Sequence, residues 1–335
     1  MSPRPGRGPR SSRDPRSSRN PPSSRNPKVV ALGGGHGLAA SLSALKLLTD
    51  RVTAVVTVAD DGGSSGRLRE EFAVLPPGDL RMALAALCDD TEWGHTWRDV
   101  LQHRFQGDGP LAGHALGNLL IVSLWDLLGD TVDGLDLVGR LLNSRGRVLP
   151  MASVPLEIEA QIAGHDGASP EALVTVRGQH RVASSTGRVQ SVRLLPPDPA
   201  SPPETLEAVA EADWVIVGPG SWFTSVMPNL LVPDLRDALV TTRAGKLLNL
   251  NLEVHAGETK GYRAQDHIES LVKHAPELQF DVVLADPSCV EDEAEVQRAA
   301  DLVGARLVVT SVATTGQPGR HDALRLAAAY RDVIG

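Results

Sequence analysis

The sequence predicts an α/β fold: a Rossmann-like, doubly wound, mostly parallel sheet with a helical segment and a small β-rich insertion. Apolar, β-branched runs alternate with amphipathic helical patterns through most of the chain, as expected for parallel strands joined by crossover helices. With 335 residues and a hydrophobic content of 41%, the chain is also long and apolar enough to bury a substantial core.

The alternation can be followed element by element. Runs with the character of buried strands occur at 28–34, 52–60, 213–220, 246–253, 281–286 and 306–313. Helical patterns lie between most of them, at 38–48, 204–212, 264–275, 291–303 and 321–333. We expect residues 28–335 to form a single domain.

Two stretches of this domain break the alternation. Residues of about 77–143 are predicted to be helix after helix, and the segment 114–128 is apolar all round, so we expect it to be buried. Residues of about 147–196 have the pattern of short strands separated by Gly, Ser and Pro turns. We interpret this second stretch as a β-rich insertion packed on the sheet.

The first 27 residues differ in composition from the rest of the chain. They are rich in Arg, Ser and Pro and have too few apolar residues to form a core, so we expect this tail to be disordered. Through Lys28 the segment carries a net charge of +7, which leaves −15 for the remainder of a chain with −8 overall. Dispersed arginines can tether phosphates, but composition favours a solvated extension, and the acidic body does not favour specific nucleic-acid binding.

The cysteine content and the hydropathy pattern indicate the cellular compartment of the protein. Cys88 and Cys289 lie far apart, so neither a disulfide framework nor a zinc site is indicated. The chain has no apolar segment of secretory type at its start and no apolar run long enough for a transmembrane helix. We therefore expect a cytoplasmic protein.

The first candidate site follows the first predicted strand, in the run KVVALGGGHGL at 28–38. Glycines have no Cβ and let the backbone approach a ligand closely, while the following helix N-terminus offers free N–H groups and partial positive charge. A tight turn needs only one or two glycines, so this density favours phosphate contact. The run also fits the G-x-G-x-x-A form of a dinucleotide turn. The candidates are Gly34, Gly35, His36 and Gly37.

The second candidate site follows the second strand, in VTVADDGGSSGRLR at 56–69. Ligands of open α/β sheets bind at the carboxyl ends of the strands, so this loop and the first should face one crevice. Its carboxylates suit a ribose hydroxyl, a Mg²⁺ ion or an acceptor hydroxyl, and its Gly-Gly-Ser-Ser run suits an anion. The candidates are Asp60, Asp61, Gly62, Gly63, Ser64, Ser65 and Arg67, with Asp61 as the possible Mg²⁺ ligand.

Two helical motifs supply further polar groups. In PPGDLRM (76–82), Asp79 can cap the following helix, whereas Arg81 suits a phosphate or carboxylate of the ligand. In LAGHALGNLL (111–120), His114 and Asn118 are four residues apart and are predicted to share one helix face. Because buried polar groups need partners, this pair either forms a satisfied core pair or faces a site.

Two later strands also end in special turns. The segment VIVGPGSWFTS (215–225) repeats the phosphate-turn pattern, and two such turns suggest a diphosphate ligand or two phosphorylated partners. The segment 249–267 places polar residues after another strand. The candidates are Gly218, Gly220, Ser221, Asn251 and Glu258. No P-loop, G-x-S-x-G elbow, H-E-x-x-H motif or Cys/His cluster occurs, which argues against those enzyme classes.

Taken together, the motifs GGGHGL, ADDGGSSGRLR, PPGDLR, LAGHALGNLL, VIVGPGSWFTSVMPNLLV and AGETKGYRAQDHI resemble those of the YvcK family. Members of this family are called gluconeogenesis factors and share a superfamily with the 2-phospho-L-lactate transferase CofD. The resemblance runs from about residue 28 to the C-terminus, although His36 stands where many relatives have Thr. GRHD (319–322) resembles the family's C-terminal Arg-His-Asp, which makes Arg320 a ligand candidate; ordinary charge at a helix start is the alternative.

The resemblance implies a nucleotide diphosphate ligand, UDP-N-acetylglucosamine, bound at the strand ends. It also implies a role that links carbon metabolism to cell-wall synthesis and cell shape, with cell-wall synthesis proteins as possible partners. A Mg²⁺-dependent transferase, with Asp60 or Asp61 activating an acceptor hydroxyl and Arg81 stabilising phosphate charge, is the alternative. An NAD-dependent oxidoreductase has only the dinucleotide-type turn in its favour. Homo-oligomerisation would be ordinary for this class of protein.

Overall fold

The computed structural model describes residues 26–165, 169, 171–253, 257–317 and 319–335. The tail predicted to be disordered therefore lies, up to residue 25, outside the described residues. Within the described ranges the chain forms a seven-stranded parallel sheet, ordered β10-β9-β8-β7-β1-β2-β3, and a three-stranded antiparallel sheet, ordered β5-β4-β6. The predicted α/β class with a mostly parallel sheet is confirmed.

The parallel sheet is built outward from a central pair of strands. Strand β1 (Val29–Gly33) pairs with β2 (Val52–Val56) on one side and β7 (Trp214–Val217) on the other. Because the chain leaves this centre in opposite directions, the switch point lies between β1 and β7, where open α/β sheets bind ligands. The outer strands are β3 (Gly146–Pro150), β8 (Gly245–Asn249), β9 (Val282–Ala285) and β10 (Arg306–Val309).

One strand of the main sheet differs from the expectation. Strand β3 falls inside the stretch of about 147–196 that we expected to belong to the insertion, and it pairs in parallel with β2. It forms the edge of the sheet and has Pro150 as its last residue, so it lacks a long β-branched run. The three-stranded sheet begins only at β4 (Glu157–Ala163) and continues with β5 (Leu173–Arg177) and β6 (Arg188–Leu195).

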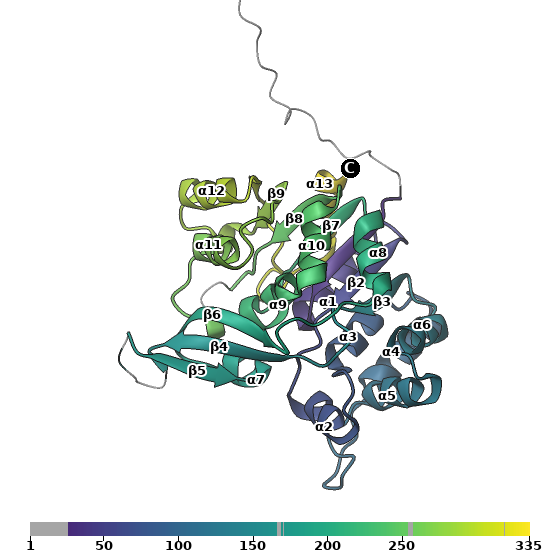
Figure 1. Cartoon of the computed structure of the whole chain (residues 1–335). Helices are drawn as coiled ribbons and strands as arrows, with labels where there is room; N and C mark the ends of the chain where they lie inside the picture. Colours follow the sequence, from purple (N-terminus) through teal and green to yellow (C-terminus); the bar gives the residue numbers. More distant parts are fainter. Residues whose placement is uncertain (1–25, 166–168, 170, 254–256, 318) are drawn as a thin grey trace, which may run out of the picture.

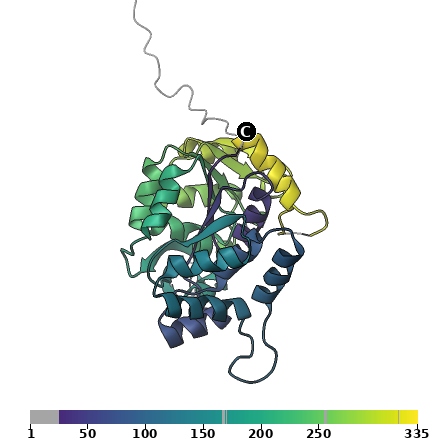
Figure 2. The same ribbon diagram turned by 90° about the vertical axis from the view of Figure 1, so that its right-hand side faces the viewer.

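Helices cover both faces of the parallel sheet. Helices α8 and α10 pack together on one face, and α1, α3 and α13 pack together on the other (Figures 1 and 2). The helices are α1 (Gly35–Leu45), α2 (Gly63–Phe72), α3 (Gly78–Leu87), α4 (Glu92–Gln102), α5 (Leu116–Leu128), α6 (Thr131–Leu141), α7 (Gln179–Ala183), α8 (Pro203–Glu211), α9 (Met227–Leu231), α10 (Pro233–Thr241), α11 (Ala264–His274), α12 (Glu293–Leu302) and α13 (Ala323–Ile334). No helix in the described part of the chain is long and apolar enough to span a membrane.

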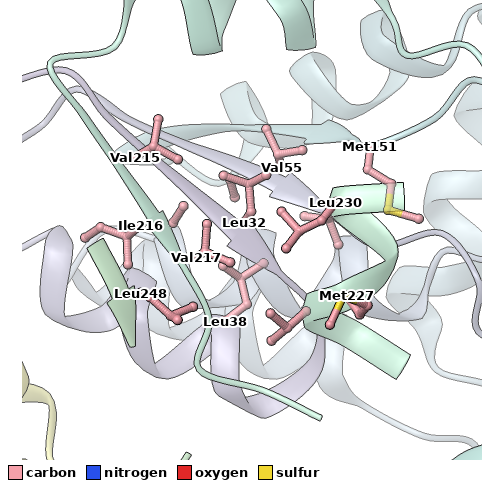
Figure 3. Close-up of a cluster of buried hydrophobic side chains, with 14 of the residues drawn as sticks. Leu32, Leu38, Val55, Met151, Val215, Ile216, Val217, Met227, Leu230 and Leu248 are labelled. Atoms are coloured by element: carbon pink, nitrogen blue, oxygen red, sulfur yellow. The ribbon is translucent and has the colours of Figure 1, made fainter. Parts of the chain in front are cut away.

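The core forms where the central strands meet these helices. Figure 3 shows Leu32 and Val217 from the sheet packed against Leu38 of α1 and Leu230 of α9. Each of these side chains is at most 1% exposed. Such burial on both faces explains why the central strands are continuously apolar rather than alternating.

Helix α5 is less buried than its sequence predicts. Ile121 and Trp125 are buried, but Leu127 is 76% exposed and Leu128 is 43% exposed. Helices α4 and α6 pack against α5, and α6 reaches its C-terminal end, where Trp125 Nε1 donates to the carbonyl oxygen of Thr131 (2.9 Å). An apolar residue on every face of a helix does not reveal which face will find a partner.

Candidate functional site

The two glycine turns predicted to bind phosphate meet at the switch point. A Cβ added at Gly37 would lie 2.3 Å from the carbonyl oxygen of Pro219 and 2.6 Å from the Cα of Gly220. The α1 turn and the turn after β7 are therefore in backbone contact, at a distance that only glycine permits. Gly34 is the N-cap of α1 and provides no side-chain cap, and Gly35 has a φ of 58°.

A buried network of polar groups holds these two turns in place. Asn229 Nδ2 donates to Thr57 Oγ1 (3.0 Å) and to the Ser225 carbonyl oxygen (2.8 Å), while the Thr57 hydroxyl lies 3.1 Å from the Gly33 oxygen. These contacts hold the ends of β1 and β2 against the segment after β7. Sequence reasoning did not select Thr57 or Asn229, because single polar residues inside apolar runs give no sign of their partners.

A second network supports the turn after β7 from the side of α13. The Tyr330 hydroxyl lies 2.6 Å from Ser41 Oγ and accepts a hydrogen bond from Asn249 Nδ2 at 2.9 Å. Ser41 Oγ in turn lies 3.1 Å from the carbonyl oxygen of Gly218, within donating distance. Helices α1 and α13 and strand β8 therefore hold Gly218 in place. These three side chains were also absent from the sequence-based candidates.

A cavity of about 320 Å³ opens beside the two turns. The side chain of Asn251 bridges its wall, accepting from the Gly220 N–H (2.8 Å) and donating to the Gly220 carbonyl (2.7 Å). The cavity thus combines residues from the carboxyl ends of β1, β7 and β8. Among the residues that line the cavity are five that the sequence predicted as ligand contacts: Gly37, Gly220, Ser221, Asn251 and Glu258.

Glu258 gives this cavity a buried acid. It is only 4% exposed, and its Oε1 accepts a hydrogen bond from the Phe223 N–H at 2.7 Å. Burial raises the pKa of Glu258 to about 7, against the opposing effect of donors on Phe223 and Thr224. Its Oε2 is buried with no partner meeting hydrogen-bond geometry.

The C-terminal loop contributes a different residue from the predicted one. Arg320 is exposed and donates to Gln317 Oε1 at 3.2 Å, and it does not line the cavity. Its neighbours Gly319 and His321 do line it. Burial lowers the pKa of His321 to about 4, although the nearby Asp286 carboxylate opposes this shift.

The carboxylates of the second motif separate in the structure. Asp60 accepts a hydrogen bond from the Gly62 N–H at 2.9 Å and lies near Asp79. Burial, with the Asp60 charge as the next cause, raises the pKa of Asp79 to about 7, against a backbone hydrogen bond from Gly35. Asp79 therefore lies at the N-terminus of α1.

Asp61, the proposed Mg²⁺ ligand, has another contact. It is exposed and accepts a hydrogen bond from the N–H of His180 at 2.9 Å, joining the loop after β2 to α7. Among the described residues, no group of three or more His, Cys, Asp or Glu side chains is arranged to hold a metal ion. Asp79 lies against the α1 turn with Asp60 close to it, and a pair of carboxylates suits Mg²⁺ only when ligand phosphates complete its coordination.

A third group of candidates forms a buried cluster. Ser64 Oγ lies 3.0 Å from His114 Nδ1 and accepts from Asn118 Nδ2 at 2.9 Å, and Arg81 Nε donates to Asn118 Oδ1 at 2.8 Å. The helix predicted to carry both His114 and Asn118 begins only at Leu116, so His114 lies in the turn before it. Their shared partner, rather than a shared helix face, brings the two residues together.

The cluster borders a separate space. Ser64 and Arg67 line a cavity of about 770 Å³ that shares no lining residue with the cavity at the switch point. Arg67 donates to the carbonyl oxygens of Pro110 (3.2 Å) and Ala112 (2.7 Å) and so fastens the loop before α5. The predicted ligand residues that line these two cavities therefore fall into separate groups, and other predicted residues, such as Asp79, Arg81 and Arg320, line neither of the two.

Comparison with known proteins gives a consistent result. The chain matches the sequence model of the family described as 2-phospho-L-lactate transferase CofD over residues 29–321. It is 50% identical over 303 residues to a Mycobacterium tuberculosis (strain ATCC 25618 / H37Rv) protein named "Putative gluconeogenesis factor", with 90% of this chain and 88% of that protein covered. It is 38% identical over 281 residues to the gluconeogenesis factor of Bacillus subtilis (strain 168), with 84% of each chain covered.

A solved structure supports the same relationship. The crystal structure of a UPF0052 family protein from Bacillus halodurans superposes with a TM-score of 0.80 at 33% sequence identity, covering 91% of this chain and 99% of that one. The resemblance identified from the motifs is thereby confirmed over nearly the whole described fold. The chain belongs to the CofD family and, within it, to the YvcK group of gluconeogenesis factors.

Proposed function

We propose that this protein binds a nucleotide diphosphate sugar, UDP-N-acetylglucosamine, in the cavity at the switch point. The observation that supports this most directly is the backbone contact between Gly37 and the Pro219–Gly220 turn. It brings the N-terminus of α1 and a second glycine turn to one cavity wall, and a helix N-terminus of this kind suits phosphate oxygens.

The remaining features of the cavity fit such a ligand. Its volume of about 320 Å³ falls within the range of roughly 300–1,000 Å³ typical of small-molecule sites. Glu258 offers a buried carboxyl oxygen without a partner, which suits a sugar or ribose hydroxyl as donor. The phosphates and the hydroxyl groups of the ligand would thus meet different walls of the cavity.

In this proposal the protein is a cytoplasmic regulator rather than a catalyst. Ligand occupancy would link carbon metabolism to cell-wall synthesis and cell shape by changing contacts with cell-wall synthesis proteins or between copies of the chain. Such a change requires the ligand to bind one conformation more tightly than another. The naming of relatives as gluconeogenesis factors supports the metabolic part of the proposal.

A transferase of the CofD type is the second candidate. The pair formed by Asp60 and Asp79 favours it, because burial and the neighbouring charge raise the pKa of Asp79 to about 7, a value suited to accepting a proton from a hydroxyl. With Asp79 as the base, Asp60 and the ligand phosphates are the groups that would hold Mg²⁺. The ion would supply charge stabilisation for the transferred phosphoryl group.

Calorimetric titration separates the two candidates. The full chain is titrated with UDP-N-acetylglucosamine, with and without Mg²⁺, and with GDP and NAD as controls. We expect saturable binding of the UDP-sugar, with the ligand mass unchanged after long incubation. Failure to bind the UDP-sugar, together with Mg²⁺-dependent binding of GDP, would replace the regulator with the transferase.

A further inference from the structure

His321 is an unexplained feature of the cavity at the switch point. It lies in the loop between β10 and α13, where it forms a backbone bridge with Ala313. The residue lines the cavity, yet its Nε2 is buried without a hydrogen-bond partner in the described structure. An unpaired buried polar atom costs free energy, and a ligand atom that forms a hydrogen bond with the imidazole would remove this cost.

The position of His321 relative to the glycine turns indicates which ligand atoms it would meet. Gly37 lines the same cavity and lies in the first turn of α1, where the N–H groups of a helix suit the oxygens of a diphosphate. We propose that the imidazole of His321 pairs with the diphosphate of the bound nucleotide sugar and takes up a proton when the ligand binds. The inference deepens the proposed function and rests on it.

The charges around His321 determine its protonation in each state. Asp286 is the acid that favours the imidazolium, but it accepts hydrogen bonds from Ser288, Val312 and Ala313 N–H groups, which offset its charge. Burial prevails and leaves the imidazole neutral at pH 5.5 and above, since its pKa is about 4. A diphosphate brings two negative charges into this desolvated space and so favours the imidazolium.

Other charged side chains also lie near the loop. Glu253 is next to Gly319, because a Cβ there would lie 2.7 Å from its Cδ, and Glu258 lines the same cavity. Arg325 of α13 donates to the Ala313 carbonyl and to side chains of the same loop. Arg320 and Asp322 flank the histidine, with Asp322 capping α13.

At pH 5.5 the titration of His321 can be separated from that of the buried carboxyl groups. At pH 5.5, Asp79 and Glu258 already carry their protons, because the pKa of each is about 7. A diphosphate esterified at both ends has no proton that titrates near this pH. Any proton taken up on binding must therefore go to a group that is unprotonated in the free protein, as the neutral imidazole is.

Titration of the full chain with UDP-N-acetylglucosamine at pH 5.5, in buffers of different ionisation enthalpy, measures this uptake. We expect about half a proton or more per ligand for the native protein and His95→Gln, and none for His321→Gln; His95 lies on α4 and does not line the cavity. Uptake that persists in His321→Gln, or no uptake by the native protein, overturns the inference and leaves the proposed binding intact. Absence of UDP-sugar binding by the native protein overturns the proposed function itself.

A second measurement applies if His321→Gln binds too weakly to titrate. NMR spectra of histidine-labelled native protein follow the His321 ring signals against pH with and without the UDP-sugar. We expect the midpoint to move upward from about 4 to about 5.5 or higher on binding, a roughly thirtyfold or larger change in proton affinity. An unchanged midpoint in the presence of saturating ligand overturns the inference.

Discussion

A few single residues determine the shape and charge of the proposed site. Gly37 has no side chain where two backbone segments touch, and Asn251 provides the one side chain that bridges the wall on both sides of Gly220. Asp79 places a carboxyl at the start of α1, in the position where a ligand anion would also be favoured. The chemistry of this region therefore depends on the protonation of a few acids.

Substitution of Gly37 tests the backbone contact. In Gly37→Ala, the added Cβ would overlap the Pro219 carbonyl oxygen at 2.3 Å, so the two turns must move apart. We expect affinity for UDP-N-acetylglucosamine to fall at least tenfold, or about 1.4 kcal/mol, in calorimetric titration. Gly109→Ala is the matched control, because a Cβ there meets nothing within 4 Å. Equal affinities of the two variants would contradict a ligand at this contact.

Substitution of Asp79 tests the raised pKa. Its value in the folded protein, about 7, exceeds the ordinary 3.8, so folding favours the protonated carboxyl. The stability contributed by this group is complete below about pH 4 and is lost as the pH rises toward 7. Asp79→Asn cannot ionise. We therefore expect its free energy of unfolding, relative to that of the native protein, to rise by about 1–2 kcal/mol between pH 5 and pH 8.

Urea unfolding at pH 5 and pH 8 measures this difference. The expected change in the free energy of unfolding is smaller than the full pKa shift implies, because Asp79 is partly exposed and solvent screens its charge. Asp99→Asn on the exposed surface of α4 serves as the control, with a stability change independent of pH. The same pH dependence in the native protein and Asp79→Asn would show that Asp79 ionises normally.

At the scale of secondary-structure elements, the sequence predicted six of the seven strands of the parallel sheet and the glycine turns that follow β1 and β7. Buried strands and glycine turns are local patterns, and so β1, β7 and their turns could be placed. Strand β3 was missed because an edge strand of five residues ending in Pro150 has no distinctive pattern. Arg320 was predicted and its neighbour His321 was missed, because which of two adjacent residues lines the cavity depends on how the loop after β10 folds, and the sequence does not reveal this.

The same limit applies to the elements that support the site. Helix α13 is amphipathic in sequence, but nothing in that pattern shows that Tyr330 would reach Ser41 of α1 and Asn249 of β8. Likewise, Ser64 was predicted as a ligand contact, and nothing in its motif shows that His114 and Asn118 would be its partners in the fold. Pairings between distant elements form only when the sheet has brought them together.

Removal of one hydroxyl tests the coupling between α13 and the turn after β7. Tyr330→Phe leaves Asn249 Nδ2 without its partner in a buried position. We expect a loss of about 1–3 kcal/mol in the free energy of unfolding, measured with urea. Ser123→Ala, which removes an exposed hydroxyl from α5, should change stability by less than about 0.5 kcal/mol. Tyr330→Phe with native stability would show that this network is dispensable.

At the scale of the whole molecule, the chain enters the sheet at one end and forms its candidate site at the other. The described chain begins at Asn26, whose side chain donates to Asp50 at the amino ends of the strands. A hollow of about 470 Å³ also opens there, lined by Lys28, Arg51 and acidic residues of α8. It lies away from both glycine turns, so volume alone does not mark the functional site.

Truncation tests whether the arginine-rich tail takes part in ligand binding. We expect a chain that begins at Asn26 to bind UDP-N-acetylglucosamine with a Kd within twofold of the full chain. The reason is that Gly37, Gly220 and Asn251 of the cavity follow the carboxyl ends of the strands, whereas Asn26 lies at their amino ends. Loss of tenfold or more in affinity, measured by the same calorimetric titration, would assign the tail a part in the site.

The pairing of β1 with β7 also has a consequence for how the protein is made. Val29 pairs with Trp214, and the Lys28 N–H donates to Asp213 across a separation of 185 residues. At synthesis rates of about 5–20 residues per second, the ribosome needs roughly 10–40 s to deliver the second strand after the first has formed. Throughout that interval one edge of β1 lacks its neighbour, so the cavity can be completed only after most of the polypeptide has been translated.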